Sequence, residues 1–229
     1  MENNSKDLIN NYKMTIIKSD ILILGASSFL GKPLVKELEK NKSFNIICQS
    51  RKNLKELFLS KYPKISYLEI NFINQEVNFQ VFSNCSFIIN FVNASALNKN
   101  ELKNFRSFLK NVLLISNASL IHISTASVFG NCKNKIISEL SKCNPKNSYQ
   151  KIKYDDEYVM KKLANIANSK YFIIRPTEII GNKSLNARKF VKSYISSSFV
   201  KRYIIKSFYG RRICHFVSSK YLIATILKI

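Results

Sequence analysis

Short apolar runs alternate with amphipathic segments along most of this chain. Mainly apolar residues in runs of strand length predict buried strands over 20–24, 44–48, 65–70, 86–90, 120–123 and 171–175. Between these runs, apolar residues recur at helical spacing, which predicts helices over 29–40, 54–60, 98–114 and 149–167. This alternation is typical of a parallel sheet covered on both faces, so we expect an α/β, doubly wound fold.

The same pattern divides the chain into three parts. Residues 1–18 are polar and aperiodic, which indicates a flexible leader, and residues 19–181 carry the regular alternation of the main domain. The remaining residues, 182–229, offer a basic helix at 187–198, a strand at 202–207 and a final apolar helix from about Lys220. We expect this last part to form a small covering lobe, either complete or truncated.

Charge is the most unusual feature of the composition. The 37 Lys and Arg residues outnumber the 14 Asp and Glu residues, for a net charge of +23, which suggests an anionic partner. The basic residues are mostly Lys, however, and they are spread along the whole chain. We therefore attribute the charge to general compositional drift together with a phosphate-bearing substrate, and expect no specific nucleic-acid partner, since no nucleic-acid-binding module is recognisable.

Other residue patterns exclude further classes of protein. The five scattered cysteines are never spaced Cys-x-x-Cys, which argues against a disulfide framework and fits a reducing compartment. The two histidines, His122 and His215, have no neighbour at ligand spacing, so no metal site is expected. No apolar run approaches the roughly 20 residues of a membrane span, and no signal-peptide pattern opens the chain. We expect a cytoplasmic protein without a transmembrane segment.

A glycine-bounded loop, Gly25-Ala-Ser-Ser-Phe-Leu-Gly31, joins the first predicted strand to the first predicted helix. In this context glycines permit a tight turn, and the helix N-terminus offers N–H groups and a positive dipole end to a pyrophosphate. An ordinary strand-to-helix turn is the alternative. Ser28 stands where a central glycine is usual, and its hydroxyl is itself suited to donate to a phosphate. The predicted dinucleotide contacts are Gly25, Ser27, Ser28, Phe29, Leu30 and Gly31.

The end of the second predicted strand bears on the choice of cofactor. An acidic residue in this region would bind the adenosine ribose of NAD, but residues 48–52 contain no carboxylate. Arg51 and Lys52 are suited to pair with a 2′-phosphate instead. Among NADP and NAD, the sequence therefore favours NADP.

Tyr149 and Lys153 are spaced i, i+4, which places them on one face of a predicted helix. A nearby ammonium favours phenolate, so we expect Lys153 to lower the pKa of Tyr149 toward the range of a general acid/base. Because Tyr and Lys are both abundant here, a solvated helix face is the simpler explanation of the spacing alone. The context of the pair argues against it.

Four segments together resemble the extended short-chain dehydrogenase/reductase family, in its NAD(P)-dependent sugar epimerase/dehydratase group. The segments are 25–31, 123–130, Tyr149 with Lys153, and 174–181. The resemblance implies a Rossmann-like, NAD(P)-binding domain over 19–181 and a substrate-binding lobe over 182–229. It also implies an oxidoreductase or epimerase acting on a nucleotide-activated sugar, in cell-surface polysaccharide biosynthesis.

The resemblance also implies roles for single residues. Tyr149 would be the general acid/base, and Lys153 would lower its pKa and hydrogen-bond the nicotinamide ribose. Thr125 would hydrogen-bond the reacting oxygen, with Ser124 as the alternative and as a substrate contact. A family asparagine on the preceding helix matches Asn104 only weakly.

The segment after the sixth predicted strand usually lies against the nicotinamide. In this chain that places Pro176, Thr177 and Glu178 near the cofactor. Further on, Arg212 resembles a basic residue that contacts the diphosphate of a nucleotide sugar, and Arg211 is the alternative.

Three departures from the family pattern qualify these expectations. Sugar 4,6-dehydratases carry Asp-Glu directly after the catalytic Thr, whereas this chain has Ala126 and Ser127, which argues for epimerase or reductase chemistry. Asn71 stands where an acidic residue often contacts adenine, and Phe129 replaces a common Tyr. The usual C-terminal portion of the family, beyond the last helix, is missing from the pattern.

Two functions other than that of an enzyme are also compatible with the sequence. Ser28 and the short C-terminal lobe also suit a degenerate NAD(P)-binding regulatory or scaffold protein. The net charge also suits a protein that binds an anionic surface. The family resemblance further implies a homodimer through the helix bearing Tyr149 and its neighbour.

Overall fold

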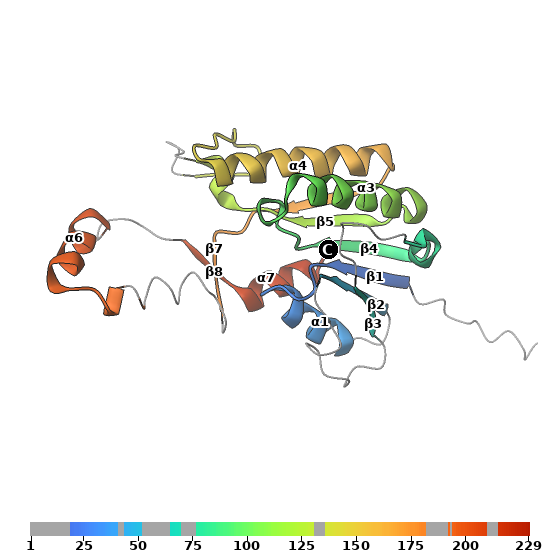
Figure 1. Ribbon diagram of the computed structural model, residues 1–229, viewed down its shortest axis with the longest axis horizontal. Helices are drawn as coiled ribbons and strands as arrows, with labels where there is room; N and C mark the ends of the chain where they lie inside the picture. Colours follow the sequence, from blue (N-terminus) through green and yellow to red (C-terminus); the bar gives the residue numbers. More distant parts are fainter. Residues whose placement is uncertain are drawn as a thin grey trace, which may run out of the picture.

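The computed structural model describes residues 19–40, 44–51, 65–69, 77–130, 136–181, 192, 194–209 and 215–229. Its centre is a six-stranded parallel sheet with the strand order β3-β2-β1-β4-β5-β6 (Figure 1). The strands are β1 (Ser19–Leu24), β2 (Phe44–Ser50), β3 (Ile65–Glu69), β4 (Cys85–Asn90), β5 (Ser119–Ile123) and β6 (Tyr171–Ile174). The predicted α/β, Rossmann-like doubly wound fold is confirmed.

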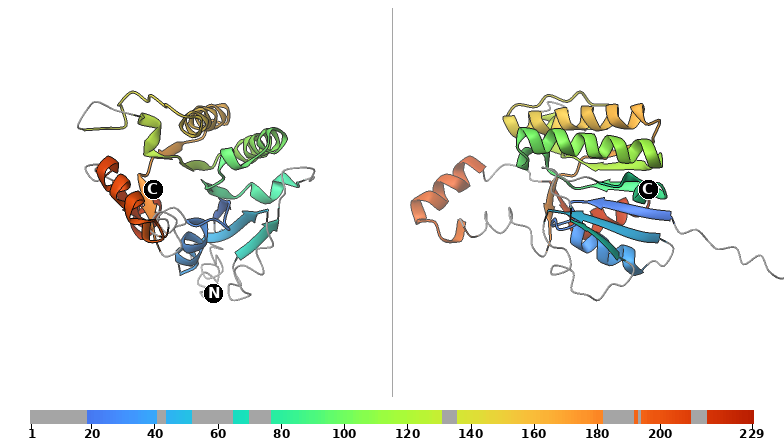
Figure 2. Two further views of the ribbon diagram at one scale, coloured as in Figure 1. Left: turned by 60° about the vertical axis from the view of Figure 1, so that its left-hand side comes forward. Right: turned by 45° about the vertical axis from the view of Figure 1, so that its right-hand side comes forward.

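Helices cover both faces of this sheet, as Figures 1 and 2 show. On one face lie α3 (Lys99–Ser116) and α4 (Ser148–Ile166), and on the other lie α1 (Gly31–Lys40) and α7 (Ser219–Ile226). The strands are apolar throughout because each is buried on both sides. In β1, Leu22 and Leu24 belong to the core under α3 and α4, while Ile21 and Ile23 belong to the core under α1 and α7.

Local side-chain caps set where the two long helices begin. The Asn98 side chain accepts a hydrogen bond from the Glu101 N–H at 2.9 Å, and the Glu101 carboxylate accepts one from the Asn98 N–H at 2.9 Å. Asn147 and Gln150 form the same reciprocal pair at the start of α4. Each of these reciprocal pairs is a capping box, which satisfies N–H groups that the first helical turn leaves without a partner.

The predicted strands and long helices agree with the structure to within about two residues at most ends. The strand predicted over 202–207 is wrong, since these residues belong to helix α6 (Phe199–Tyr209). Apolar residues recur there at 199, 200, 203 and 204, which is helical spacing, and the prediction took too short a window. The predicted helix at 54–60, the leader and most of 187–198 lie outside the described residues.

Two short strands extend the fold beyond β6. They are β7 (Glu178–Ile180) and β8 (Phe216–Ser218), which pair in parallel. At three residues each, they are too short to produce a recognisable alternation. Helix α6 lies apart from the main sheet, beyond this pair (Figures 1 and 2). In contrast α7, which follows β8 directly, packs on the main sheet through Leu222, Ile223 and Ile226.

Shorter elements connect the layers near the carboxyl ends of the strands. They are the 3-10 helices η1 (Phe79–Phe82), η2 (Ala94–Ala96) and η3 (Ala126–Phe129). Helix α4 contacts both η2 and η3, which follow β4 and β5. The start of α4 is thereby positioned at the edge where parallel strands end.

Candidate active site

A polar cavity lies where the strand order reverses. β1 pairs with β2 on one side and with β4 on the other, so the loops after β1 and β4 diverge at this point. Open α/β sheets bind ligands at such a crossover, outside the carboxyl ends of the strands. A cavity of about 450 Å³ occupies the position. It is lined by Gly25, Ser27, Ser28, Gln49, Ser50, Arg51, Phe91, Val92, Asn93, Ala96, Leu97 and Glu101.

Two positions of the loop after β1 require glycine. Gly25 has a φ of +73°, in the left-handed region that other residues rarely adopt. At Gly31, an added Cβ would lie 2.6 Å from the Ala26 carbonyl oxygen, because the first turn of α1 closes tightly on the loop. The buried Gln49 side chain holds the loop from β2 by accepting a hydrogen bond from the Gly25 N–H at 3.2 Å.

Ser28 is engaged inside this loop. Its Oγ accepts a hydrogen bond from the Gly31 N–H at 3.0 Å, so one of the free donors of the α1 N-terminus is already in use. The hydroxyl keeps its own hydrogen for a ligand. Ser27 is fixed separately, because its Oγ accepts from the Ser50 hydroxyl at 2.8 Å. Leu30 belongs to the buried core, so only its backbone is suited to face a cofactor.

Phe29 is half-buried and packs against the core under α1 and α7. Its ring also lies close to Gly181, where an added Cβ would be 3.0 Å from the ring. This contact brings the end of the segment after β6 toward the glycine loop.

Arg51 lies at the cavity with a carboxylate as its neighbour. Its Nη1 is 3.6 Å from Oε1 of Glu101, and its side chain is 48% exposed. Glu101 is held in place by the cap of α3, and its other oxygen accepts from the Asn98 N–H. A 2′-phosphate would therefore compete with Glu101 for Arg51. Lys52, the other residue expected to favour NADP, lies outside the described residues.

The segments after β5 and β6 run side by side. The Ser124 N–H donates to the Ile174 carbonyl at 2.8 Å, and the Ala126 N–H donates to the Pro176 carbonyl at 2.8 Å. Thr125 lies between these two bonds, so the structure brings it next to Pro176. The Thr125 hydroxyl caps η3 by accepting from the Ser127 N–H at 3.2 Å. Thr177 is exposed beyond this pair.

Tyr149 and Lys153 occupy the first two turns of α4, the helix that packs against η3. Tyr149 is 46% exposed, whereas Lys153 is only 6% exposed. The expected lowering of the tyrosine pKa is not found: burial, and then the negative charge of Glu178, raise the pKa of Tyr149. Burial lowers the pKa of Lys153, and Asp156 and Glu157 oppose that effect. The ammonium thus interacts chiefly with buried carboxylates and not with the phenol.

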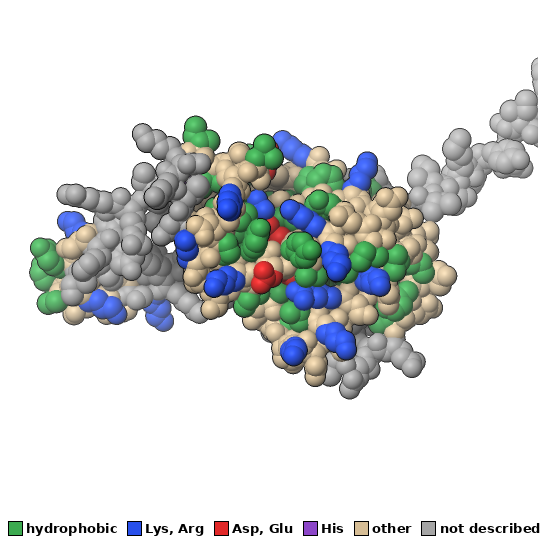
Figure 3. All heavy atoms as spheres, turned by 90° about the horizontal axis from the view of Figure 1, so that it is seen from above, with side chains coloured by type: hydrophobic (Ala, Val, Ile, Leu, Met, Phe, Trp, Pro, Cys, Tyr) green, Lys and Arg blue, Asp and Glu red, His purple; other side chains and the backbone are tan. Residues whose placement is uncertain are grey.

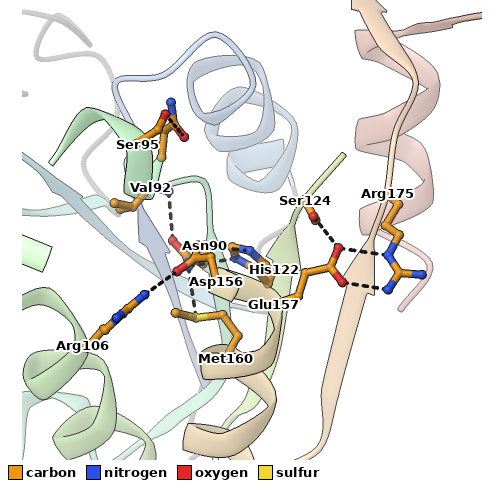
Figure 4. Close-up of polar contacts among 11 residues, drawn as sticks. Asn90, Val92, Ser95, Arg106, His122, Ser124, Asp156, Glu157, Met160 and Arg175 are labelled. Atoms are coloured by element: carbon orange, nitrogen blue, oxygen red, sulfur yellow. Dashed lines mark hydrogen bonds and ion pairs between the residues drawn. The ribbon is translucent and has the colours of Figure 1, made fainter. Parts of the chain in front are cut away.

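Of the two carboxylates, Glu157 has hydrogen bonds to both of its oxygens (Figure 4). Arg175 donates to it from Nε at 2.9 Å and from Nη2 at 2.7 Å, and the Ser124 hydroxyl donates at 2.5 Å. The guanidinium also lies 5.0 Å from the centre of the Phe129 ring. This bidentate pair ties α4 to the ends of β5 and β6, and the hydrogen bonds to the Glu157 carboxylate raise the pKa of the Arg175 guanidinium. Ser124 is therefore engaged beneath the site.

The second carboxylate, Asp156, lies among loosely matched partners (Figure 4). His122 Nε2 is 3.5 Å from one of its oxygens, and Arg106 Nη2 is 3.6 Å from the other. On its far side, His122 Nδ1 is 3.1 Å from Nδ2 of the buried Asn90. The Asn90 oxygen accepts from the Val92 N–H at 2.9 Å, in the wall of the cavity.

Sequence reasoning missed this buried network and the supports of the glycine loop. Asp156 and Glu157 follow Lys153 at i+3 and i+4, so all three lie on one face of α4, and that face is buried. Charged residues on the buried face of an amphipathic helix were the available signal. Gln49, Ser50 and Glu101 carried no comparable signal, because their roles arise from contacts between distant segments.

Several predicted residues are not placed at the site. Asn104 is half-buried on α3 and does not line the cavity. Asn71, Arg211 and Arg212 lie outside the described residues. Within the described ranges, no group of three or more His, Cys, Asp or Glu side chains is arranged to hold a metal ion. Over the same ranges, no helix combines the length and the apolar character needed to cross a membrane.

A second cavity, of about 430 Å³, lies between α1, α7 and the sheet. Apart from Glu37 and Lys228, the residues lining it are apolar, and Ile21, Phe44 and Phe87 come from the starts of strands. It is therefore at the opposite edge of the sheet from the glycine loop. On the face formed by α3 and α4, basic side chains are scattered among apolar ones and do not gather into one patch (Figure 3).

Solved structures of other proteins share this fold. A UDP-glucuronic acid 4-epimerase from Bacillus cereus, in complex with UDP-glucuronic acid and NAD, is 17% identical, with a TM-score of 0.64 over 91% of this chain and 72% of its own. A dTDP-glucose 4,6-dehydratase from Bacillus anthracis, in complex with NAD, is 14% identical, with a TM-score of 0.62 over 91% and 70%. A UDP-N-acetylglucosamine 4-epimerase from Methanobrevibacter ruminantium M1 is 13% identical, with a TM-score of 0.63 over 90% and 71%.

These identities establish a shared fold. No curated protein matches the chain by sequence. Residues 21–207, however, match the NAD dependent epimerase/dehydratase family. This match spans the glycine loop, Thr125 and the Tyr149–Lys153 pair. The chain belongs to the NAD dependent epimerase/dehydratase family.

Proposed function

We propose that the chain is an NAD(P)-dependent oxidoreductase or epimerase that acts on a nucleotide-activated sugar in cell-surface polysaccharide biosynthesis. One observation carries the proposal: the cavity at the glycine loop and the Thr125, Tyr149 and Lys153 set belong to the same carboxyl edge of one parallel sheet. The structural neighbours include enzymes in complex with NAD and UDP-sugars, which supports the substrate class.

The cavity suits the adenosine and pyrophosphate half of a nicotinamide dinucleotide. Gly25 and Gly31 allow close backbone approach, and Ser27 and Ser28 line the cavity beside the N-terminus of α1. When bound, the dinucleotide supplies or accepts the hydride. Arg51 and its partner Glu101 then decide how well a 2′-phosphate is accepted, so that NAD and NADP differ chiefly at this pair. NADP stays the favoured choice.

Tyr149 is the proposed proton-transfer group. Its raised pKa keeps the phenol protonated near neutral pH, which suits it to donate a proton to a carbonyl oxygen as hydride arrives. Thr125, on the adjoining segment, would hydrogen-bond the same oxygen by turning its hydroxyl hydrogen away from Ser127, to which it donates in the structure. Lys153 contributes a buried positive charge one helical turn further on.

Dehydration of the sugar is the less favoured reaction. Loss of water needs an acid and a base placed beside the substrate. The residues that follow Thr125, Ala126 and Ser127, begin η3, and neither is able to serve as that acid or base. Ser127 instead accepts a hydrogen bond from the Thr125 hydroxyl at 3.1 Å.

Tyr149→Phe tests the mechanism. We expect it to abolish turnover of sugar nucleotides, because the proton-transfer group is lost. The affinity for NADH and NADPH, measured by fluorescence titration, should stay within about twofold of the unmodified chain, because Tyr149 does not line the cavity at the glycine loop. Tyr154→Phe is the matched control, since Tyr154 is 41% exposed on the same helix and should retain activity. Turnover that survives Tyr149→Phe would refute the assignment.

A non-catalytic NAD(P)-binding scaffold is the second candidate. The observation in its favour is that Ser28 already engages the Gly31 N–H, which a bound pyrophosphate would otherwise use. A panel of sugar nucleotides added to the cofactor-bound protein separates the two functions. A change in the NADH signal with any of them supports the enzyme, and tight cofactor binding with no response to the whole panel supports the scaffold.

A further inference from the structure

Asp156 is a buried carboxylate whose neighbours do not satisfy it. The residue is 0% exposed, and neither of its oxygens hydrogen-bonds any part of the chain that the structure describes. His122 and Arg106 approach only to 3.5 Å and 3.6 Å. Burying a carboxylate without hydrogen bonds is costly unless a nearby positive charge compensates it. The question is which cation does so.

His122 is not that cation. It is completely buried, and burial together with the charge of Lys153 lowers its pKa to about 3. The Asn90 oxygen accepts from the Val92 N–H, so the Asn90 amide group donates to His122 Nδ1 and the ring proton lies on Nε2. At neutral pH Asp156 therefore faces an uncharged imidazole N–H. Arg106 contributes only in part, because its side chain is 32% exposed to solvent.

Lys153 is the remaining cation, and Asp156 is the carboxylate free to compensate it. The two residues are three positions apart on α4, and Lys153 is buried with Asp156. Glu157 also faces this region, but its oxygens are taken by Arg175 and Ser124. A positive charge buried to this degree loses its proton easily unless a carboxylate stabilises it.

We propose that Asp156 is a supporting residue whose buried negative charge, one helical turn from Lys153, keeps the Lys153 ammonium charged within the active site. The proposal rests on the proposed function for its consequence, since a charged Lys153 is the group that would hydrogen-bond the cofactor ribose. The charged and titratable groups that interact with Lys153 are Asp156 and Glu157 on α4 and His122 on β5. Arg106 on α3 and Arg175 after β6 in turn pair with Asp156 and Glu157. Through His122 and Asn90, the same carboxylate also connects α4 to the Val92 backbone in the cavity wall.

Asp156→Asn tests the inference, because it removes the charge and keeps the shape. NMR titration of lysines labelled at Cε reports the pKa of Lys153 directly, with its signal assigned as the one missing in Lys153→Arg. We expect the Lys153 pKa to fall by about one unit or more in Asp156→Asn. Asp155→Asn is the matched control on the exposed face of α4 and should leave the titration unchanged.

A second variant acts in the opposite direction. Arg106→Gln removes a competing positive charge near Asp156, so the Lys153 pKa should rise, and this variant decides the matter if Asp156→Asn does not fold. An unchanged or raised Lys153 pKa in Asp156→Asn, or an unchanged one in Arg106→Gln, would overturn the inference.

The same samples separate this inference from the proposed function. The alkaline limb of the pH dependence of NADH affinity and of kcat/KM should move down in Asp156→Asn and up in Arg106→Gln. A wild-type chain that binds no dinucleotide at any pH overturns the proposed function, while the lysine titration still decides whether Asp156 holds the charge of Lys153.

Discussion

Mild acid should destabilise this protein through a single histidine. The His122 ring is completely buried at the centre of the network, and burial and the charge of Lys153 lower its pKa from 6.5 to about 3. In the unfolded chain the same ring takes up a proton near pH 6.5. A group whose folded-state pKa is depressed contributes stability that is complete above its unfolded pKa. That stability is lost as the pH falls from about 6.5 toward 3.

The size of the loss follows from proton linkage. Within the window between the two pKa values, the unfolded chain binds one more proton than the folded one, which costs about 1.4 kcal/mol per pH unit. Acidification from pH 6.5 to 5 should therefore remove about 2 kcal/mol of unfolding free energy. Small domains have only about 5–15 kcal/mol in total, so the change is readily measured. Asp156, whose pKa burial raises, takes up a proton in the folded state and offsets part of the loss.

Urea denaturation followed by circular dichroism at pH 7.5, 6.5, 5.5 and 5 is the assay. The His122→Gln variant keeps Asp156 and the other carboxylates but removes the titrating ring, so the difference between the two pH profiles isolates the histidine. The wild-type profile should fall more steeply than the variant profile below pH 6.5. Parallel profiles over this range would show that His122 is not held neutral, and the reasoning about the network would fail.

Two further predictions concern the glycine loop and the second carboxylate. Ser28→Gly should release the Gly31 N–H for a pyrophosphate and raise dinucleotide affinity up to about tenfold, equivalent to about 1.4 kcal/mol. Fluorescence titration measures this affinity. A lower affinity in the variant would show instead that the serine hydroxyl is the better donor. Glu157→Gln should reduce the unfolding free energy by about 3 kcal/mol or more, because it leaves the Arg175 guanidinium without its bidentate partner. In urea denaturation beside Asp155→Asn, a loss no larger than that of the exposed control would contradict this estimate.

The sequence pattern predicted the sheet well because its strands are buried on both faces. Such strands are continuous apolar runs, and β1, β4 and β5 are recognisable from composition alone. β7 and β8 were missed because three residues show no period, and α6 was misread as a strand over 202–207. The pattern therefore works where an element is long and its burial is uniform.

The candidate site was predictable only at positions where the local backbone itself restricts which residue type is possible. Gly25 and Gly31 are recognisable because backbone conformation and close approach require glycine at these positions. The pKa of Tyr149 was not predictable, since it depends on burial and on Glu178, which lies on β7 and not on the tyrosine's own helix. Spacing along a helix places side chains on a face, but the surrounding elements decide which charges they meet.

The packing of α7 has a consequence for synthesis of the chain. Leu222 and Ile226 complete the same core as Ile23 of β1 and Leu34 of α1, although they come from opposite ends of the described sequence. A nascent chain that has emerged only as far as β8 leaves this face of the sheet partly uncovered. Contacts between residues so distant in sequence slow folding and leave apolar surface available for aggregation. Emergence of α7 from the ribosome is thus the event that we expect to allow this face of the sheet to be covered.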